Sequence, residues 1–120
     1  MKRELDTNFS DAELACSCGC GMLPRPPAVL RLQALRDRVA RPLILTSAAR
    51  CYQHNKEIDG APRSRHVPEN GGDAFDIAVS GGAERGEIVH EALSMGFRGI
   101  GVAEDFVHVD LRDELTIWTY

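Results

Sequence analysis

The stretch Phe-Val-His-Val-Asp-Leu, residues 106–111, says most about which fold the sequence favours. Side chains alternate between the two faces of a β-strand, so the three aliphatic residues share one face, and His108 and Asp110 share the other. A hydrophobic core requires the aliphatic face. We therefore expect a strand from which His108 and Asp110 project together into a cleft or into solvent.

A second strand of the same kind is predicted by Ala-Phe-Asp-Ile-Ala-Val, residues 74–79. Its bulky side chains share one face, whereas Asp76 lies on the other face between Ala74 and Ala78. Small neighbours leave room around a carboxylate. The two strands thus offer Asp76 and His108 from open faces of one sheet.

Turn and helix signals place the other elements around these strands. Ser10 and Glu13 form a capping-box pattern for a short helix, and the prolines at 26–27 open a longer helix that Pro42 ends. The pattern predicts an α+β fold, a small mostly antiparallel sheet with two or three helices packed on it. A length of 120 residues fits one domain, 1–120. The remaining predicted elements are a short buried strand at 43–46, a helix at 83–95, and strands at 99–102 and near 117–120.

Residues 47–73 are polar, rich in Gly, Pro, Arg and His, and have no usable period. A long irregular segment inside a small domain is usually functional. It contains His66, which together with Asp76 and His108 would supply two imidazoles and one carboxylate oxygen. Three such ligands with an open fourth position are typical of a catalytic zinc site.

The motifs that carry these residues resemble those of the zinc D-Ala-D-Ala carboxypeptidase family. That family includes D,D-dipeptidases and phage L-Ala-D-Glu endolysins, and has the hedgehog-type fold. The matching motifs are T-S-x-x-R at 46–50, S-x-H at 64–66, G-x-A-x-D at 72–76 and F-V-H-V-D at 106–110. The resemblance extends from about Phe9 to Trp118.

The resemblance implies a zinc ion held by His66, Asp76 and His108. In family members the first His and the Asp are usually seven positions apart, whereas His66 and Asp76 are ten apart. Position seven is Asp73, which is therefore an alternative ligand. Strand parity favours Asp76, because Asp73 would share the core face with Phe75.

The resemblance also implies the other site residues. A carboxylate base lies three positions before the second zinc His in some relatives, which here is Asp105. Asp110 is the alternative base, or it could orient an imidazole. Arg50 matches the family arginine that polarises the scissile carbonyl or holds substrate, and Ser64 would shape the loop or contact substrate.

The function implied is a zinc-dependent metallopeptidase that hydrolyses peptide bonds of bacterial peptidoglycan stems, as a D-Ala-D-Ala carboxypeptidase or an endopeptidase. A non-catalytic zinc-binding interaction module and a phage lysis or tail-associated muralytic module are the alternatives. The expected partner is peptidoglycan or its stem peptides. The oligomeric state stays open, with a monomer assumed.

Composition excludes other partners. The net charge is −4 and Lys and Arg do not cluster, so nucleic acid is not expected to bind. No apolar run is long enough for a membrane span, and the polar start does not read as a signal peptide. We expect a protein that is cytoplasmic as synthesised, and that reaches the cell wall by lysis or in a virion if a phage encodes it.

The four cysteines are Cys16, Cys18 and Cys20 in C-S-C-G-C-G, and Cys51. Without an export signal, structural disulfides are not expected. A structural zinc is conceivable, but C-x-C-x-C is not the usual C-x2-C knuckle, and no second knuckle follows. The spacing therefore favours a reduced, Gly-rich turn.

Three further side chains are assigned structural roles. Trp118 and Tyr120 are expected to form a terminal aromatic lid on the core, and to stack against substrate only secondarily. Asn55 is expected to stabilise a turn.

Overall fold

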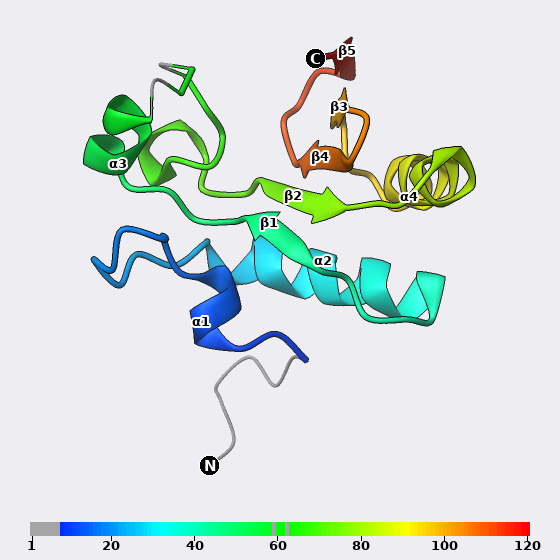
Figure 1. The fold of residues 1–120 in the computed structure, drawn as a ribbon, viewed down its shortest axis with the longest axis horizontal. Helices are drawn as coiled ribbons and strands as arrows, with labels where there is room; N and C mark the ends of the chain where they lie inside the picture. The colour runs from blue at the N-terminus through cyan, green and yellow to red at the C-terminus, as the bar shows by residue number, and fades with distance from the viewer. Residues whose placement is uncertain (1–7, 59, 62) are drawn as a thin grey trace.

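The computed structural model describes residues 8–58, 60–61 and 63–120. It contains a five-stranded sheet in the order β1-β2-β4-β3-β5, in which only the β3–β5 pair is parallel (Figure 1). The predicted α+β fold with a mostly antiparallel sheet is confirmed. In sheet order the strands are β1 (Leu45–Ser47), β2 (Phe75–Ala78), β4 (Phe106–Asp110), β3 (Gly99–Val102) and β5 (Thr116–Thr119).

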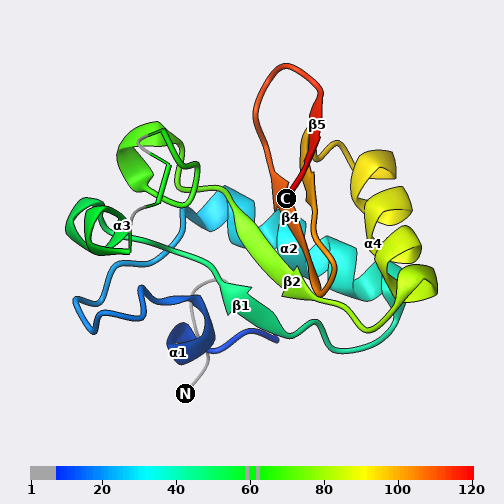
Figure 2. The ribbon, with the colours of Figure 1, turned by 45° about the horizontal axis from the view of Figure 1, so that its top comes forward.

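Two long helices, α2 (Pro26–Val39) and α4 (Gly82–Ser94), contact one another, and Figure 2 shows α2 passing behind the sheet. The buried aliphatic side chains of β2 and β4 pack with those of the two helices in one hydrophobic core. Alternation along the strands then leaves the polar residues on the opposite face. The core members contributed by strands and helices include Phe75, Ile77, Val107, Val109, Val29, Leu32, Leu35, Ile88 and Ala92.

The helix signals in the sequence correspond to real helix ends. In α1 (Asp11–Leu14), the hydroxyl of Ser10 accepts from the backbone N–H of Glu13, and the Glu13 carboxylate accepts from the backbone N–H of Ser10. Pro26 occupies the first turn of α2, where a missing N–H leaves no hydrogen bond unmade. Both predicted helix starts are confirmed.

The segment 47–73 contains two elements that the sequence pattern did not predict. They are α3 (Tyr52–Glu57) and a single 3-10 turn, Pro68–Asn70. In α3 only Asn55 is buried, so the helix has no apolar stripe from which a period could be read. Among the described residues, no helix is both long and apolar enough to cross a lipid bilayer.

Candidate metal centre

A row of paired residues crosses the polar face of the sheet. In the strand register, Asp76 of β2 lies opposite His108 of β4, which lies opposite Gly101 of β3, which lies opposite Trp118 of β5. Antiparallel and parallel pairing therefore sets residues far apart in sequence side by side. His66 reaches the same place from the loop before β2.

The side chains of His66, Asp76 and His108 converge on one point. One donor atom from each lies within 4.8 Å of the other two. Asp76 Oδ1 is 3.2 Å from His66 Nε2 and 3.0 Å from His108 Nδ1. The structure thus brings together the three residues that the sequence predicted as metal ligands.

The outer nitrogen of each imidazole is held by a fixed acceptor. His66 Nδ1–H donates to the carbonyl oxygen of Ala48 at 2.6 Å, and His108 Nε2–H donates to Asp110 Oδ2 at 2.7 Å. A carbonyl or carboxylate oxygen can only accept, so each neutral ring presents its lone pair inward. His66 therefore faces the centre with Nε2, and His108 with Nδ1.

This arrangement fits a metal cation. Two imidazole lone pairs and the anionic Asp76 oxygen point at one another, and they repel unless a proton or a cation lies between them. Two imidazole nitrogens and one carboxylate oxygen are also the donor types that zinc takes in catalytic sites. The outer hydrogen bonds to Ala48 and Asp110 are those that usually orient metal-binding histidines.

The electrostatics of the centre favour positive charge. Burial alone would raise the pKa of Asp76, but hydrogen bonds with His108 and His66 outweigh it and hold this pKa well below its ordinary range. Burial would likewise lower the pKa of His108, yet the carboxylates of Asp110 and Asp76 raise it. The site is therefore built to hold a cation beside an ionised Asp76.

Asp110 is buried and paired, which corrects the expectation of an open strand face. Its side chain is 0% exposed and contacts His108 and both Nε and Nη2 of Arg112, at 2.9 and 2.7 Å for the arginine. Although burial would raise the pKa of Asp110, Arg112 and then His108 hold it below its ordinary range. Gly99 lies beneath, and a Cβ there would lie 2.0 Å from Asp110 Oδ1.

Trp118 packs beside the centre, against His108, whereas the sequence predicted a lid on the core. Its ring lies 5.1 Å from that of His108, and the Arg112 guanidinium carbon lies 4.6 Å above it. A Cβ at Gly101 would come within 2.7 Å of Trp118 Nε1, so only glycine lets the indole lie flat here. Trp118 and Tyr120 therefore belong to the cavity wall.

The centre opens into a cavity of about 480 Å³. Arg50, Arg63, Arg65 and Arg112 all contribute to its wall, so the cavity that the Asp76 carboxylate faces has a cationic lining. The other lining residues are Gly60, Ala61, Ser64, His66, Phe106, His108, Trp118 and Tyr120.

Arg50 is held in place by uncharged partners. Its guanidinium donates to Ser47 Oγ at 3.1 Å, to Asn55 Oδ1 at 3.0 Å and to Ser64 Oγ at 3.5 Å. Asn55 is 4% exposed, and its amide also donates to the carbonyl of Ala61. Asn55 thus stabilises the loop, as expected, and also positions Arg50.

Comparison with known proteins gives the family. The model of the Peptidase M15 family matches residues 7–110, which is most of the chain. The chain belongs to the peptidase M15 family. The predicted resemblance to the D-Ala-D-Ala carboxypeptidase family is confirmed at this level, and the family supports a peptidase. No individual curated protein matches the sequence.

Asp73, the alternative ligand, has a different partner in this M15 chain. Arg65 Nε donates to Asp73 Oδ1 at 3.0 Å, and Arg65 Nη2 contacts Asp73 Oδ2. This hydrogen-bonded pair raises the pKa of Arg65. Asp73 is not part of the cluster formed by His66, Asp76 and His108.

Asp105, the expected base, lies in the turn between β3 and β4 of the M15 chain. β4 begins at Phe106, so Asp105 precedes the strand as its proposed role requires. Its side chain is exposed and does not line the cavity, and its carbonyl accepts from the N–H of Val79 at 2.9 Å. The structure does not bring Asp105 together with the metal-ligand cluster.

Two contacts of the centre, those of Arg112 and of the Ala48 carbonyl, were not predicted from the sequence. The spacing of Arg112 two positions after Asp110 was a usable signal, because both residues can reach the same side of an extended segment. The contact of Ala48 with His66 carried no signal, since any residue has a backbone carbonyl.

Proposed function

We propose that this chain is a zinc-dependent peptidase that hydrolyses peptide bonds of peptidoglycan stems, as a carboxypeptidase or an endopeptidase. The observation that carries the proposal is the convergence of His66, Asp76 and His108 on one point in the wall of a cavity. Membership of the peptidase M15 family supports hydrolysis.

His66, Asp76 and His108 would hold the zinc. When bound, the zinc polarises the scissile carbonyl and lowers the pKa of water. The chain contributes rigid ligand geometry, because Ala48 fixes one imidazole and Asp110 fixes the other. The ring of Trp118 packs against that of His108 and adds to the wall beside the site.

The charge of the cavity wall supports an anionic peptide as substrate. Peptidoglycan stems carry free carboxylates, and a guanidinium binds such a group with two parallel hydrogen bonds. Arg65 and Arg112 are paired with Asp73 and Asp110, respectively. The hydrogen-bond partners of Arg50 are neutral, so its charge is available to a substrate carboxylate or to a developing oxyanion.

The proposed proton acceptor is Asp105. Asp110 is a weaker candidate, because its two oxygens already accept from Arg112 and His108. In its present position Asp105 lies outside the cavity wall, so the base requires the turn between β3 and β4 to approach the substrate.

One observation favours a second function. Among the described residues of the cavity wall, Asp76 is the sole carboxylate. A metal-binding module without hydrolysis needs no further carboxylate. We also propose that the protein is cytoplasmic as synthesised, and that it reaches the cell wall by lysis or in the virion if a phage encodes it.

The test is digestion of purified peptidoglycan and of stem pentapeptides by the zinc-loaded protein, with mass spectrometry of the products. We expect release of D-alanine or a cut within the stem, and no release by the His108→Ala variant. If the zinc-loaded chain binds stem peptides but cleaves none, the second function replaces the first.

A further inference from the structure

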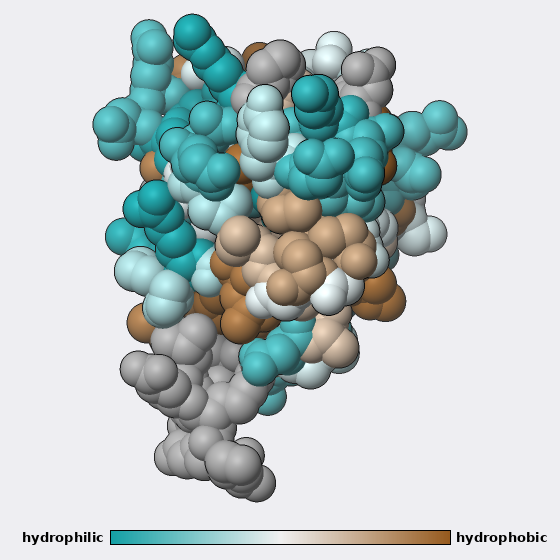
Figure 3. Space-filling view, turned by 90° about the vertical axis from the view of Figure 1, so that its left-hand side faces the viewer, coloured by the Kyte–Doolittle hydropathy of each residue, from teal (hydrophilic) through white to brown (hydrophobic). Residues whose placement is uncertain are grey.

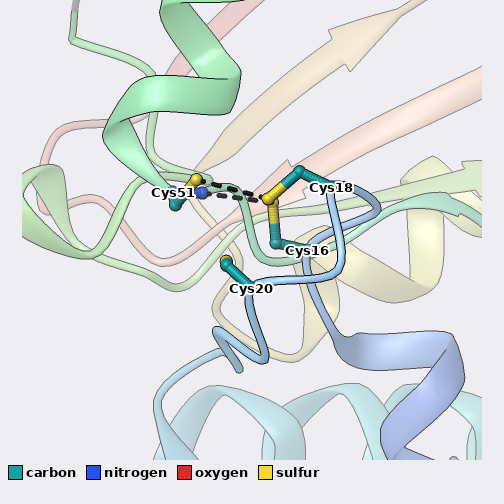
Figure 4. A group of neighbouring side chains, drawn as sticks. All are labelled: Cys16, Cys18, Cys20 and Cys51. Carbon is teal, nitrogen blue, oxygen red and sulfur yellow. Dashed lines mark hydrogen bonds between the residues drawn. The ribbon is translucent and has the colours of Figure 1, made fainter.

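A second cluster of metal-ligand side chains lies away from the cavity. The sulfur atoms of Cys16, Cys18, Cys20 and Cys51 all lie within 4.8 Å of one another. Three come from the loop after α1, and Cys51 immediately precedes α3 (Figure 4). The sequence spacing favoured a reduced, Gly-rich turn, but the fold brings in the fourth thiol, that of Cys51, from beyond β1.

Glycines explain how a C-x-C-x-C spacing can converge. In an extended chain the first and last of three alternate residues, such as Cys16 and Cys20, would lie about 13 Å apart, which is too far for both to bind one metal ion. Here Gly19 and Gly21 adopt φ of +87° and +85°, which side-chain-bearing residues rarely reach. The resulting loop is closed by a hydrogen bond from the N–H of Cys16 to the carbonyl of Met22 at 2.8 Å.

The sulfur separations fit a shared metal, and the four thiols form no disulfide. Cys18 Sγ is 3.4 Å from Cys16 Sγ and 3.6 Å from Cys51 Sγ. A disulfide requires about 2.05 Å. Four sulfurs around a tetrahedral ion at about 2.3 Å lie about 3.8 Å apart, close to the observed spacing. All four residues are free cysteines.

Backbone N–H groups point at two of the sulfurs. The N–H of Cys51 donates to Cys16 Sγ at 3.4 Å, and the N–H of His54 donates to Cys51 Sγ at 3.3 Å. Hydrogen bonds of this kind stabilise the anionic thiolate, which is the form that binds metal. The cluster therefore offers both the donor geometry and the environment of a four-sulfur site.

We propose that Cys16, Cys18, Cys20 and Cys51 bind a second zinc ion, which has a structural role and tethers the loop after α1 to the start of α3. Four thiolates in a closed tetrahedron are typical of structural rather than catalytic zinc. This site does not depend on the proposed peptidase activity.

Backbone hydrogen bonds connect the cysteine cluster to the histidine centre. Arg50 directly precedes Cys51, and its N–H donates to the carbonyl of His66 at 3.0 Å. The N–H of Ala49 donates to the carbonyl of Leu14 at 3.1 Å, and Ala48 accepts from the His66 ring. The cysteine cluster thus fixes the segment that positions Arg50 and His66.

The cysteine loop and α3 lie on the side of the molecule shown in Figure 3. That side is hydrophilic over its upper part and moderately hydrophobic in the middle. Cys18 and Cys20 are exposed, so the site can exchange metal with solvent and is accessible to thiol reagents.

The experiment is metal analysis of the full chain purified under reducing conditions. We expect two zinc ions per chain in the wild type, one in Cys20→Ser, one in His108→Ala, and two in the matched control Ser17→Ala. We also expect the unfolding midpoint of Cys20→Ser to fall by about 5 °C or more. If the wild type holds one zinc that His108→Ala loses and Cys20→Ser keeps, the proposal is wrong.

A second measurement needs no variant. Loading the wild type with Co²⁺ should give an intense near-ultraviolet sulfur-to-metal band and the visible bands of a tetrahedral ion. Absence of the sulfur band, with four thiols titrating at the same rate with and without Co²⁺, overturns the proposal. Failure to hydrolyse peptidoglycan leaves both measurements unchanged, so the two proposals fail separately.

Discussion

His108 Nε2 lies 2.7 Å from Asp110 Oδ2, two residues further along the same strand. Arg112 holds the same carboxylate from the other side, and its guanidinium lies over Trp118. A series of side-chain contacts therefore leads to the proposed metal, from Trp118 through Arg112 and Asp110 to His108. A change at any link is expected to reach the metal through the orientation of one imidazole.

Asp110→Asn should weaken zinc binding at the His66–Asp76–His108 centre by about 10–100-fold, because the His108 ring loses its charged acceptor. A competition titration with a chromophoric chelator measures this affinity. The His108→Ala variant, which should lack zinc at this centre, shows how much of the signal comes from zinc bound by the cysteine cluster. Asp113→Asn is the matched control, an exposed carboxyl on the same segment that should leave the affinity unchanged. Unchanged affinity in Asp110→Asn would show that the contact with His108 does not orient the ring.

The metal-free centre should have its own pH dependence. The pKa of His108 is raised in the folded chain, so its stabilisation is complete below the unfolded value of about 6.5 and is lost as pH rises through the folded pKa. Zinc binding at the same centre releases protons and so strengthens as pH rises. Urea unfolding of metal-free protein should therefore lose stability above about pH 6.5, whereas zinc-loaded protein gains it.

The control for this pH dependence is a pair of histidine variants. His108→Ala should remove the metal-free loss of stability, and His90→Ala, at an exposed position on α4, should keep it. If wild type and His108→Ala show the same slope without metal, protonated His108 does not stabilise the fold.

Asp76→Ala and Asp73→Ala should separate the two ligand alternatives. Asp76→Ala should lose the zinc of the histidine centre, because its oxygen lies at hydrogen-bond distance from both rings. Asp73→Ala should keep this zinc and lose stability, because Arg65 is left half-buried without its carboxylate. Metal analysis and urea unfolding measure the two effects. Loss of zinc in Asp73→Ala alone would reverse the assignment.

Asp105→Asn should keep zinc and fold but lose activity by about 10²–10⁴-fold, the usual contribution of a general base. Initial rates on a stem peptide, together with metal content, test this expectation. Glu104→Gln, the exposed neighbour in the same turn, should be nearly fully active. Full activity in Asp105→Asn would transfer the role of base to another residue.

Sequence alone predicted the elements whose signal is local. The capping box of Ser10 and Glu13, the prolines at the start of α2, and the alternation along β2 and β4 depend on neighbouring residues only. Strand parity also placed Asp76 and His108 on one face. The family motifs contain the same two residues, because a metal site requires both side chains to project from the same face of the sheet.

Tertiary structure decided what depends on residues distant in sequence. Parity could not show that Trp118 and Arg112 close over His108 and Asp110, since β5 pairs with β3 only after the chain has turned back. The sequence pattern also could not predict α3, because the residue that this helix buries is the polar Asn55.

The cysteines show the same limit most clearly. Sequence spacing described three thiols in a turn and one elsewhere. The fold places Cys51 beside Cys18 because β1 leads directly into the segment that contacts the loop after α1. A ligand set is a property of distances in space, and the chain fixes those only when long-range hydrogen bonds and core packing form.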